Sequence, residues 1–482
     1  MPGLFDVLRA SRFRLRPVRR GRWTTRPRLN RSLWGEISPP ALFTLSFAAL
    51  IAGGTLGLQL LPGIYTGASL SWLDAAFTVT SAVCVTGLIV VDTATHFTPF
   101  GQAWILLCIQ LGGLGIIAFT SLIAAVLGQR MSLRQESLSA SALTDVAPHV
   151  DARRLLRDVV RFTFLIEAAG AVVLTGLFAR HQPFGHALWN GVFHSISAFC
   201  NAGFSTFSAS LMDYQTNAPV LLVVAGLIVL GGLGFLTIEE IVLWTKAVRR
   251  RHRFRLSLHS RIVLAATAVL LVVGTVGGYV FETDVTLARL PEPFKWLNAF
   301  FFSVTARTAG FNSIDYSAAT PAANFLTILL MFVGGSPGST AGGAKTTTFA
   351  LLALLAWARF RGRTSTGLWG RTVPQETLNR AVNQAMLYMT FVTLGILALV
   401  ALEGRHTAEA KFLGYMFESV SAFNTVGLSM NITATLGTAS KVVTLLLMFV
   451  GRVGPVAVAA ALAQRPAATP IVRYAYEDVV VG

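Results

Sequence analysis

Long apolar segments alternate with shorter ones along this chain, and the alternation occurs four times. Each unit begins with an apolar segment that is long enough to cross a bilayer as a helix, which takes about 20 residues. These first crossings are expected at 41–62, 157–180, 261–282 and 381–403. A second apolar segment ends each unit, at 102–128, 218–246, 321–358 and 438–462. The pattern therefore predicts eight membrane-spanning helices.

Between the two crossings of each unit lies a segment that is too short to span the membrane. These segments are 72–85, 187–200, 294–306 and 411–424. Each of them is followed by a turn that contains glycine. Non-helical backbone at membrane depth is tolerated only where it is buried in protein or lines a water-filled path. We therefore expect four re-entrant pore helices, each ending in a loop that lines a pore.

The four glycine turns are in register with one another. They consist of Val85, Thr86 and Gly87; Asn201, Ala202 and Gly203; Thr308, Ala309 and Gly310; and Thr425, Val426 and Gly427. Their glycines lie 116, 107 and 117 residues apart. A phenylalanine precedes each glycine by ten residues, at Phe77, Phe193, Phe300 and Phe417. Another glycine follows 24 to 28 residues later, at Gly112, Gly231, Gly334 and Gly451. Such a constant register indicates one structural unit used four times.

These features predict an all-α polytopic membrane protein with four membrane–pore loop–membrane repeats around one central pore. The predicted repeats are 41–128, 129–246, 247–358 and 359–462. A basic N-terminal tail (1–40) and a C-terminal tail (463–482) flank them.

Composition and charge agree with a membrane location. Hydrophobic residues make up 54% of the chain and charged residues only 13%, about half the charged fraction of a soluble protein. Ten arginines lie between residues 9 and 31, whereas 63–100 and 181–217 contain neither lysine nor arginine. This asymmetry follows the positive-inside rule. We expect an inner-membrane protein with both termini in the cytoplasm.

The net charge of +17 would suggest nucleic-acid binding in a soluble protein. Because the basic residues are distributed as topology signals, we expect no nucleic-acid partner. The N-terminal arginines have two other interpretations, a transit peptide or a segment that contacts anionic membrane lipids. The three cysteines lie in apolar surroundings and indicate no disulfide framework.

The four turns have the chemistry of a cation filter. An ion that crosses a membrane loses its hydration shell, and a ring of backbone carbonyls replaces that shell in potassium filters. Glycine is expected in such a ring because it adopts backbone conformations that a Cβ atom disfavours. Each preceding pore helix also directs the partially negative end of its dipole at the turn. The three residues of each turn are the candidate ion-binding residues.

The motifs around the turns resemble those of the Trk/Ktr/HKT potassium-uptake superfamily, and most closely its KtrB-type membrane subunit. The resemblance covers about residues 40–482 and is carried by 81–88, 197–204, 305–312, 334–345, 421–429 and 451–455. It implies potassium transport, with sodium as a second candidate ion, and a homodimer with one pore in each subunit. It also implies a cytoplasmic ring of nucleotide-binding regulatory subunits of the KtrA type. We expect no covalently bound cofactor.

A glycine-rich run interrupts the second crossing of the third unit. Its glycines are Gly334, Gly335, Gly338, Gly342 and Gly343, and Lys345 follows them. Glycine weakens a helix interior by about 1 kcal/mol per residue relative to alanine. By resemblance to the family, this loop and Arg452 form a gate below the filter. The alternatives are a helix break without function and a phosphate-binding loop, although Ala344 separates Gly343 from Lys345 and departs from the phosphate-loop pattern.

Arg452 lies inside an apolar crossing, where a charge costs about 2.5–3.5 kcal/mol on an insertion scale. We therefore expect it to face the pore or a partner, or to cap the carbonyls of a broken helix. The Gly-Gly-Leu-Gly runs at 112–115 and 231–234 are expected to permit close helix packing. Glu167, Glu239 and Glu240 are expected to pair with arginines at helix ends, with an ion site as the alternative.

Two other classes of function compete with an ion pathway. A secondary carrier of another solute also has broken helices at the membrane midplane, but it is usually built from two halves rather than four units. An enzyme requires a nucleophile beside a base, and the polar residues here are scattered along the chain. The sequence therefore favours a non-enzymatic potassium transporter, with a carrier as the alternative.

Overall fold

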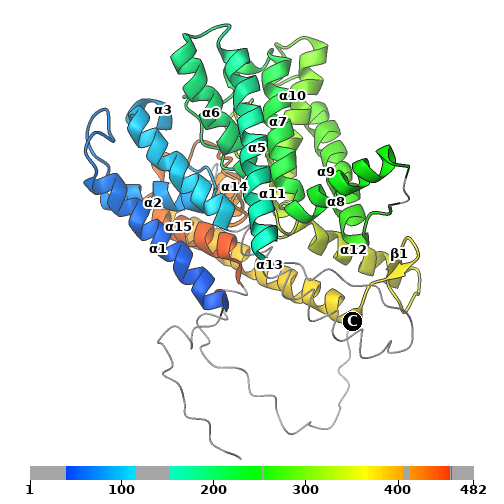
Figure 1. Ribbon diagram of the computed structural model, residues 1–482. Helices are drawn as coiled ribbons and strands as arrows, with labels where there is room; N and C mark the ends of the chain where they lie inside the picture. Colours follow the sequence, from blue (N-terminus) through cyan, green and yellow to red (C-terminus); the bar gives the residue numbers. More distant parts are fainter. Residues whose placement is uncertain (1–38, 116–151, 252–253, 405–411, 456–457, 459–482) are drawn as a thin grey trace, which may run out of the picture. The chain divides into compact units, whose positions relative to one another are not determined.

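The computed structural model describes residues 39–115, 152–251, 254–404, 412–455 and 458 of the chain (Figure 1). The predicted tails 1–40 and 463–482 therefore lie outside the described residues, apart from positions 39 and 40. The same holds for residues 116–128 of the predicted second crossing of the first repeat. The described part is almost entirely helical.

Four long helices occur close to the predicted first crossings. They are α1 (Pro39–Leu60), α5 (Ala152–Phe178), α9 (Leu258–Glu282) and α13 (Gln375–Glu403). All four are long and apolar enough to cross a membrane. We call each of these helices, together with the elements up to the next one, a unit.

A short helix follows the long helix of each unit and packs against it. These short helices are α2 (Trp72–Val83), α6 (Phe184–Cys200), α10 (Glu292–Thr305) and α14 (Phe412–Phe423). Their C-terminal halves are almost fully buried, whereas α2 begins at an exposed cap where Ser71 Oγ accepts a hydrogen bond from Asp74 N. Such a cap satisfies one of the free N–H groups at the helix start. The short helices therefore point inward, away from their exposed ends.

The last apolar segment of each unit takes a different form in different units. It comprises helical residues 99–115 in the first unit, α7 (Ala218–Leu233) and α8 (Phe235–Arg249) in the second, α11 (Pro321–Phe332) and α12 (Thr346–Phe360) in the third, and α15 (Thr438–Val453) in the fourth. The interruption predicted in the third unit is present. The prediction of one continuous helix at 218–246 is wrong, because α7 and α8 are bent by 104° at Gly234, whose φ is +84°.

The remaining elements are short. They are α3 (Thr93–His96), η2 (Met212–Tyr214), η4 (Thr433–Thr435) and a hairpin of β1 (Gly367–Leu368) and β2 (Arg371–Thr372).

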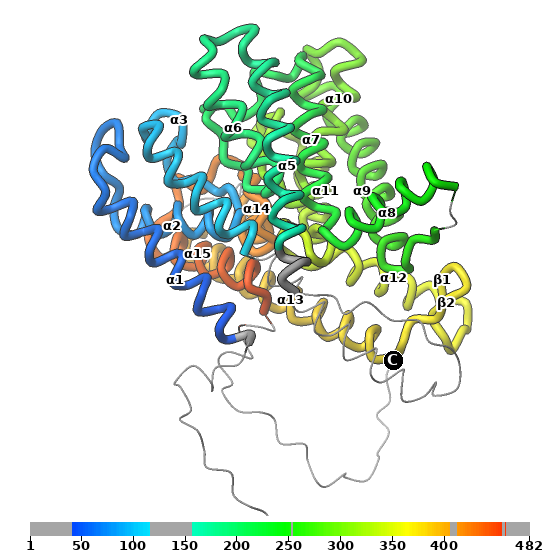
Figure 2. Tube along the Cα trace, in the orientation of Figure 1, coloured from blue at the N-terminus to red at the C-terminus, as the bar shows by residue number. Residues whose placement is uncertain are grey.

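The units are arranged in a closed ring in chain order. Trp189 Nε1 donates to Gln102 Oε1 between the second and first units, over 2.7 Å. Helix α10 packs against α7, α11 against α14, and α15 against α2. Helices α1 and α15, the first and last described, lie side by side in Figures 1 and 2. The fourth unit thus closes on the first.

Candidate ion-conduction site

The four predicted turns share one backbone conformation. The residue two positions before each glycine has a positive φ, namely Val85 (+55°), Asn201 (+60°), Thr308 (+68°) and Thr425 (+51°). The glycines themselves have φ values of +101° (Gly87), +69° (Gly203), +79° (Gly310) and +91° (Gly427). Left-handed backbone is uncommon for residues other than glycine. Its recurrence at four equivalent positions shows that the same turn is built four times.

The turns meet at their glycines. A Cβ atom on any of these glycines would lie within 3 Å of the backbone of the next turn: 2.5 Å from Ala202 O for Gly87, 2.8 Å from Gly310 Cα for Gly203, 2.6 Å from Val426 O for Gly310, and 2.0 Å from Thr86 O for Gly427. Each turn therefore contacts the following one, and the fourth contacts the first. We call Gly87, Gly203, Gly310 and Gly427 the glycine ring.

A hydroxyl group at the end of each short helix supports the turn that follows. Ser81 Oγ accepts from Gly87 N (3.0 Å) and Ser421 Oγ accepts from Gly427 N (3.1 Å). In the other two units the hydroxyl donates instead, from Ser197 Oγ to Phe204 O (2.7 Å) and from Thr305 Oγ1 to Phe311 O. The sequence analysis missed these residues. The signal that identifies them is a serine or threonine followed by alanine at the start of each turn motif.

The third turn is one residue shorter than the others. Six positions separate Ser81, Ser197 and Ser421 from their ring glycines, and five separate Thr305 from Gly310. The buried phenylalanine of each short helix lies four positions before the hydroxyl residue, at Phe77, Phe193, Phe301 and Phe417, with at most 1% of each exposed. The assignment of Phe300 to this set is wrong, because the deletion shifts the register by one.

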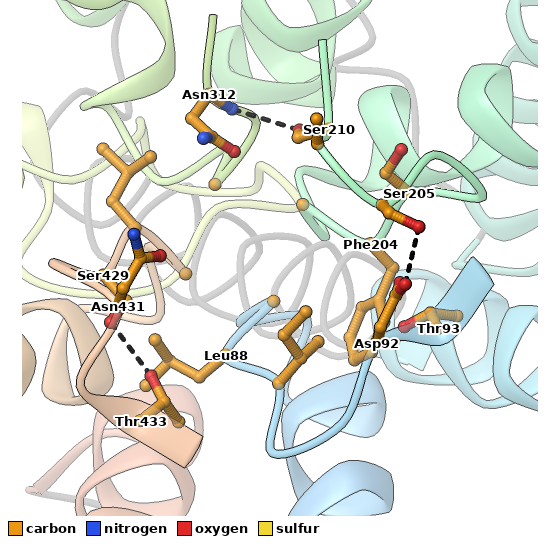
Figure 3. A pocket seen from close by; sticks show the side chains of 18 of the residues that line it. Leu88, Asp92, Thr93, Phe204, Ser205, Ser210, Asn312, Ser429, Asn431 and Thr433 are labelled. Atoms are coloured by element: carbon orange, nitrogen blue, oxygen red, sulfur yellow. Dashed lines mark hydrogen bonds between the residues drawn. The ribbon is translucent and has the colours of Figure 1, made fainter. Parts of the chain in front are cut away.

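A vestibule of about 350 Å³ opens on one side of the glycine ring and is lined by all four ring glycines. Asp92 is the only charged residue among its described lining residues. Its Oδ2 accepts from Ser208 Oγ over 2.6 Å, and the rim is further linked by Asn312 N with Ser210 Oγ (Figure 3). A cleft lined by one sign of charge concentrates ions of the opposite sign. The vestibule therefore suits a cation.

Two fully buried ionisable side chains hold the rim of the vestibule from behind. His194 Nε2 lies 2.9 Å from Ser205 Oγ in the second unit. Glu418 Oε2 accepts from Ser429 Oγ over 2.8 Å in the fourth unit. Thr433 donates to the other oxygen of the same carboxylate. Because His194 Nδ1 lies 2.8 Å from the Asn190 carbonyl, which can only accept, Nδ1 carries the proton.

The glycine-rich loop between α11 and α12 contacts the fourth turn on the side away from the vestibule. A Cβ atom on Gly342 would lie 2.0 Å from Thr425 Oγ1, and one on Gly343 would lie 2.8 Å from Asn424 Oδ1. Neither of these side-chain oxygens has a hydrogen-bond partner among the described residues. The loop thus lies directly against the ring-forming segment of the fourth unit.

The other residues predicted for the gate hold this loop in shape. Gly334 N donates to Ala344 O (2.9 Å), Thr346 N donates to Gly335 O (3.0 Å), and Lys345 Nζ donates to Ala341 O (2.7 Å). Tyr388 of α13, which the sequence analysis missed, donates from its hydroxyl group to Gly343 O over 3.1 Å.

The loop also completes the backbone hydrogen bonding of the broken helix in the second unit. Ser336 N donates to Gly232 O (3.0 Å), and Phe235 N, the first amide of α8, donates to Gly338 O (3.0 Å). A Cβ atom on Gly234 would lie 2.6 Å from Pro337 O. Helix ends leave unpaired N–H and C=O groups that need partners. The bend at Gly234 and the loop at Gly338 supply such partners to each other.

Arg452 links the loop to the first unit. Only 2% of the residue is exposed, and its guanidinium donates from Nη1 to Thr340 O and from Nη2 to Gly112 O, over 3.2 Å in the second case. Of the roles predicted for Arg452, the capping of backbone carbonyls is the one observed. The charge is held between the loop and helical residues 99–115.

The expectation of close helix packing at the glycine runs is confirmed for Gly112 and Gly231. A Cβ atom on Gly112 would lie 1.9 Å from Val83 O, and one on Gly231 would lie 1.9 Å from Phe199 O.

The expected pairing of Glu167 with arginine is wrong. Its Oε2 accepts from Gln110 Nε2 over 3.0 Å, and Cys200 Sγ lies 3.7 Å from its Oε1. A buried carboxylate can be satisfied by neutral donors.

The fold and the ring together define a helical membrane protein of the transport class. The TrkH family, described as cation transport proteins, matches residues 45–468. The chain belongs to this family, as the motifs around its turns predict.

Curated relatives match nearly the whole chain. The chain is 36% identical to the Ktr system potassium uptake protein B of Vibrio alginolyticus, over 92% of this chain and 95% of that protein. It is also 36% identical to the potassium/sodium uptake protein NtpJ of Enterococcus hirae, over 93% and 98%. The crystal structure of the potassium transporter TrkH from Vibrio parahaemolyticus has the same fold, with a TM-score of 0.70 and 19% identity over 90% of this chain and 87% of that chain. The chain is thus an integral membrane transport protein and not an enzyme.

Proposed function

We propose that this protein takes up potassium through a pore whose narrowest part is the glycine ring. The observation that carries the proposal is the mutual contact of four turns with one backbone conformation. Relatives named as potassium uptake proteins, each covered over nearly its whole length, support the choice of ion.

The ion-binding groups of this proposal are backbone carbonyls. The residues concerned are Val85, Thr86, Gly87, Asn201, Ala202, Gly203, Thr308, Ala309, Gly310, Thr425, Val426 and Gly427. Carbonyl oxygens replace the water that potassium loses on entry. The C-terminal dipole ends of α2, α6, α10 and α14 favour a cation at the same place. Because all four ring positions are glycine, we propose a preference for potassium and rubidium over sodium.

We propose an architecture of four repeats with eight crossings and four pore helices around this single pore, and with both termini in the cytoplasm. Repeat boundaries near 128, 246 and 358 belong to the same proposal. The distribution of arginine supports the orientation. Cysteine labelling tests it: a membrane-impermeant maleimide should label Asp213→Cys from outside and Arg251→Cys only after the membrane is permeabilised. The reverse pattern would reject the orientation.

We propose that the loop at 334–345 and Arg452 form the gate. The loop lies against the fourth turn, and a fixed positive charge beside the path would repel a cation. The hydrogen bonds of the loop to Gly231, Gly232 and Phe235 indicate that moving it requires a change in the second unit as well.

The partners proposed for this chain are a second copy of itself and a cytoplasmic nucleotide-binding subunit of the KtrA type. Support for the second comes from relatives that are named as components of a Ktr system. Sodium dependence is proposed as a further property, since one relative is named as a potassium/sodium uptake protein.

Rubidium uptake by a bacterium that lacks its own potassium-uptake systems tests the proposal. Expression of this chain should restore growth at low potassium and rubidium uptake, and omission of sodium should lower the rate if sodium stimulates transport. A secondary carrier of another solute would give no rubidium uptake, so that outcome would reject the potassium pathway.

A further inference from the structure

The end of α12 and the hairpin after it form an exposed surface that the proposed conduction path does not use. This surface comprises Trp357, Arg359, Phe360, Arg361, Arg363, Trp369 and Arg371, and we call it the α12 anchor. The anchor combines strong positive charge with exposed aromatic rings, and the two features are supported by different observations.

The positive charge of the α12 anchor has no acidic partner in the part of the chain that the structure describes. No aspartate or glutamate occurs in residues 316–375. None of the four arginines lies within salt-bridge distance of a carboxylate among the described residues. Arg359 donates to the carbonyls of Arg363 and Thr364 and thereby shapes the turn. The other three arginines, Arg361, Arg363 and Arg371, are exposed.

The aromatic rings of the anchor are unusually exposed. Phe360 is 85% exposed and Trp357 is 55% exposed. The Arg361 guanidinium carbon lies 4.6 Å from the centre of the Trp357 ring, which is a cation–π contact. Helix α12 has 15 residues and is about 22 Å long. It is therefore long enough to extend from the loop at the ring to the headgroup region of a bilayer whose apolar core is about 30 Å thick.

The hairpin tip holds a third aromatic ring in a strained conformation. Trp369 has a φ of +50° and Gly370 has a φ of +77°, and Trp369 is 51% exposed. Two-residue hairpin turns with positive φ at both positions normally carry asparagine, aspartate or glycine. Left-handed backbone costs a residue with a Cβ atom roughly 1–2 kcal/mol. Trp369 thus adopts an unfavourable backbone conformation while about half of its surface is exposed.

From these observations we infer that the α12 anchor binds anionic phospholipids, with Arg361, Arg363 and Arg371 at the phosphate groups and the aromatic rings in the headgroup region. Tryptophan is enriched at membrane interfaces, and arginines beside the surface are attracted to anionic lipid. The inference rests on the proposed membrane orientation but not on the ion that is transported. Because α12 begins directly after Lys345, the bound lipid would hold the helix that follows the loop.

Native mass spectrometry of the purified full-length protein tests this inference. Phosphatidylglycerol should bind more tightly than phosphatidylcholine. The triple variant Arg361→Gln/Arg363→Gln/Arg371→Gln should bind phosphatidylglycerol more weakly, by about fivefold for each arginine removed. A control triple variant, Arg180→Gln/Arg289→Gln/Arg380→Gln, removes the same charge from exposed positions elsewhere and should bind like the wild type. Glycerol phosphate in excess should not displace the lipid.

Three results would overturn the inference. They are equal binding of both lipids by the wild type, undiminished phosphatidylglycerol binding by the first triple variant, and displacement of the lipid by glycerol phosphate. None of these measurements involves ion flux, so their failure would leave the proposed function intact.

A second variant separates a lipid contact from a structural role of the hairpin. Trp369→Gly removes the strained conformation and should raise the melting temperature in detergent, while it lowers the affinity for phosphatidylglycerol. Trp369→Tyr should retain most of the binding. If Trp369→Gly binds phosphatidylglycerol as tightly as the wild type, the hairpin tip has no part in lipid binding.

Discussion

The turn of the third unit differs from the other three in the structure that supports it. In units one, two and four a carbonyl in the last turn of the short helix faces a close-packed glycine. The pairs are Val83 O with Gly112, Phe199 O with Gly231 and Phe423 O with Gly451. In the third unit the corresponding glycine, Gly334, faces Gly342 O of the loop instead. The same unit has the shorter turn. The unit that carries the loop therefore lacks the helix contact that supports the other turns.

A buried arginine, Arg307, stands at the corresponding position of the third unit. It lies two positions after Thr305, as Val83 does after Ser81. Only 8% of Arg307 is exposed, and its Nη2 lies 3.4 Å from Thr267 Oγ1 and 3.5 Å from Thr346 Oγ1, at the limit for hydrogen bonding. The arginine thus joins α10 to α9 and to the first residue of α12.

The third unit thus shares its ring backbone with the other three units but differs from them in the packing behind the turn. The backbone of the glycine ring is the same in all four units, whereas the support behind it differs in the third. We interpret the uniform part as the element that conducts and the exceptional part as the element that regulates. Four sets of variants test this separation.

The largest effect is expected from a substitution in the uniform part. Gly87→Ser puts a side chain on a backbone with φ +101° and 2.5 Å from Ala202 O, so the ring must widen or distort. The selectivity for rubidium over sodium should fall by about tenfold, because displaced carbonyls replace the water of the preferred ion less well. A change of about 1.4 kcal/mol in the difference between the two ions' binding free energies corresponds to this factor. Flux of both ions into proteoliposomes measures it.

Gly63 provides the matched control, because it also has a positive φ (+76°) but no atom near its potential Cβ. Gly63→Ser should leave the selectivity unchanged. If Gly87→Ser is as selective as the wild type, Gly87 does not line the conduction path.

The second-largest effect, an increase in ion flux, is expected when the glycine-rich loop between α11 and α12 is shortened. Deletion of Ser339–Gly343 removes the residues that contact Asn424 and Thr425 and should raise the rubidium flux several-fold. The deletion also removes Thr340 O, a partner of Arg452, so the fold must be verified by gel filtration and a melting curve. A well-folded deletion that conducts no faster than the wild type would show that the loop is not the gate.

Substitution of the two buried arginines, Arg452 and Arg307, should change the melting temperature by different amounts. Both changes should affect ion flux less than the loop deletion does. Arg452→Met removes the guanidinium donors of Thr340 O and Gly112 O and should lower the melting temperature, since an unsatisfied buried group costs about 1–3 kcal/mol. Arg307→Met removes a charge with only two long hydrogen bonds. Apolar replacement of such charges is often neutral or stabilising.

The Arg307→Met variant should therefore melt at the same or a higher temperature and conduct faster, because α12 loses a link to α10. Equal destabilisation by both substitutions would contradict the assignment of Arg307 to regulation.

The smallest effect is expected for the hydroxyl groups behind the turns. Ser81→Ala and Ser421→Ala each remove the acceptor for a ring N–H, which should cost about 1 kcal/mol of stability. Ser197→Ala removes a donor to a carbonyl and should cost less, because a carbonyl is more often left with unused capacity. Chemical denaturation of the wild type and the three variants in detergent ranks their free energies of unfolding. A larger loss of stability in Ser197→Ala than in Ser81→Ala and Ser421→Ala would contradict this prediction.

Much of the helical organisation could be predicted from sequence. Long apolar segments and inter-unit spacing are enough to locate α1, α5, α9 and α13 and the short helices within a few residues. The bend at Gly234 could not be predicted, because a glycine in an apolar run is compatible with close packing and with a break. What decides between them is the loop around Gly338, about 100 residues away in sequence, whose carbonyl pairs with the first amide of α8.

The candidate site was predictable to a similar extent. The ring glycines stand out because their conformation restricts the residue type at four positions. Counting ten residues back from the ring glycine selects Phe300 in the third unit. The buried residue is Phe301, because the turn between the short helix and Gly310 is one residue shorter than in the other units. Charge alone predicts an arginine partner for Glu167, whereas in the structure its carboxylate accepts a hydrogen bond from the neutral side chain of Gln110.

The central claim is that the glycine ring binds the transported ion, and anomalous diffraction tests it most directly. Crystals grown with rubidium in place of potassium should show anomalous density on the axis of the ring, between the carbonyls of Thr86, Ala202, Ala309 and Val426. The account predicts this density in the wild type and its loss or displacement in Gly87→Ser. A ring without density in crystals of protein that transports rubidium would contradict the account.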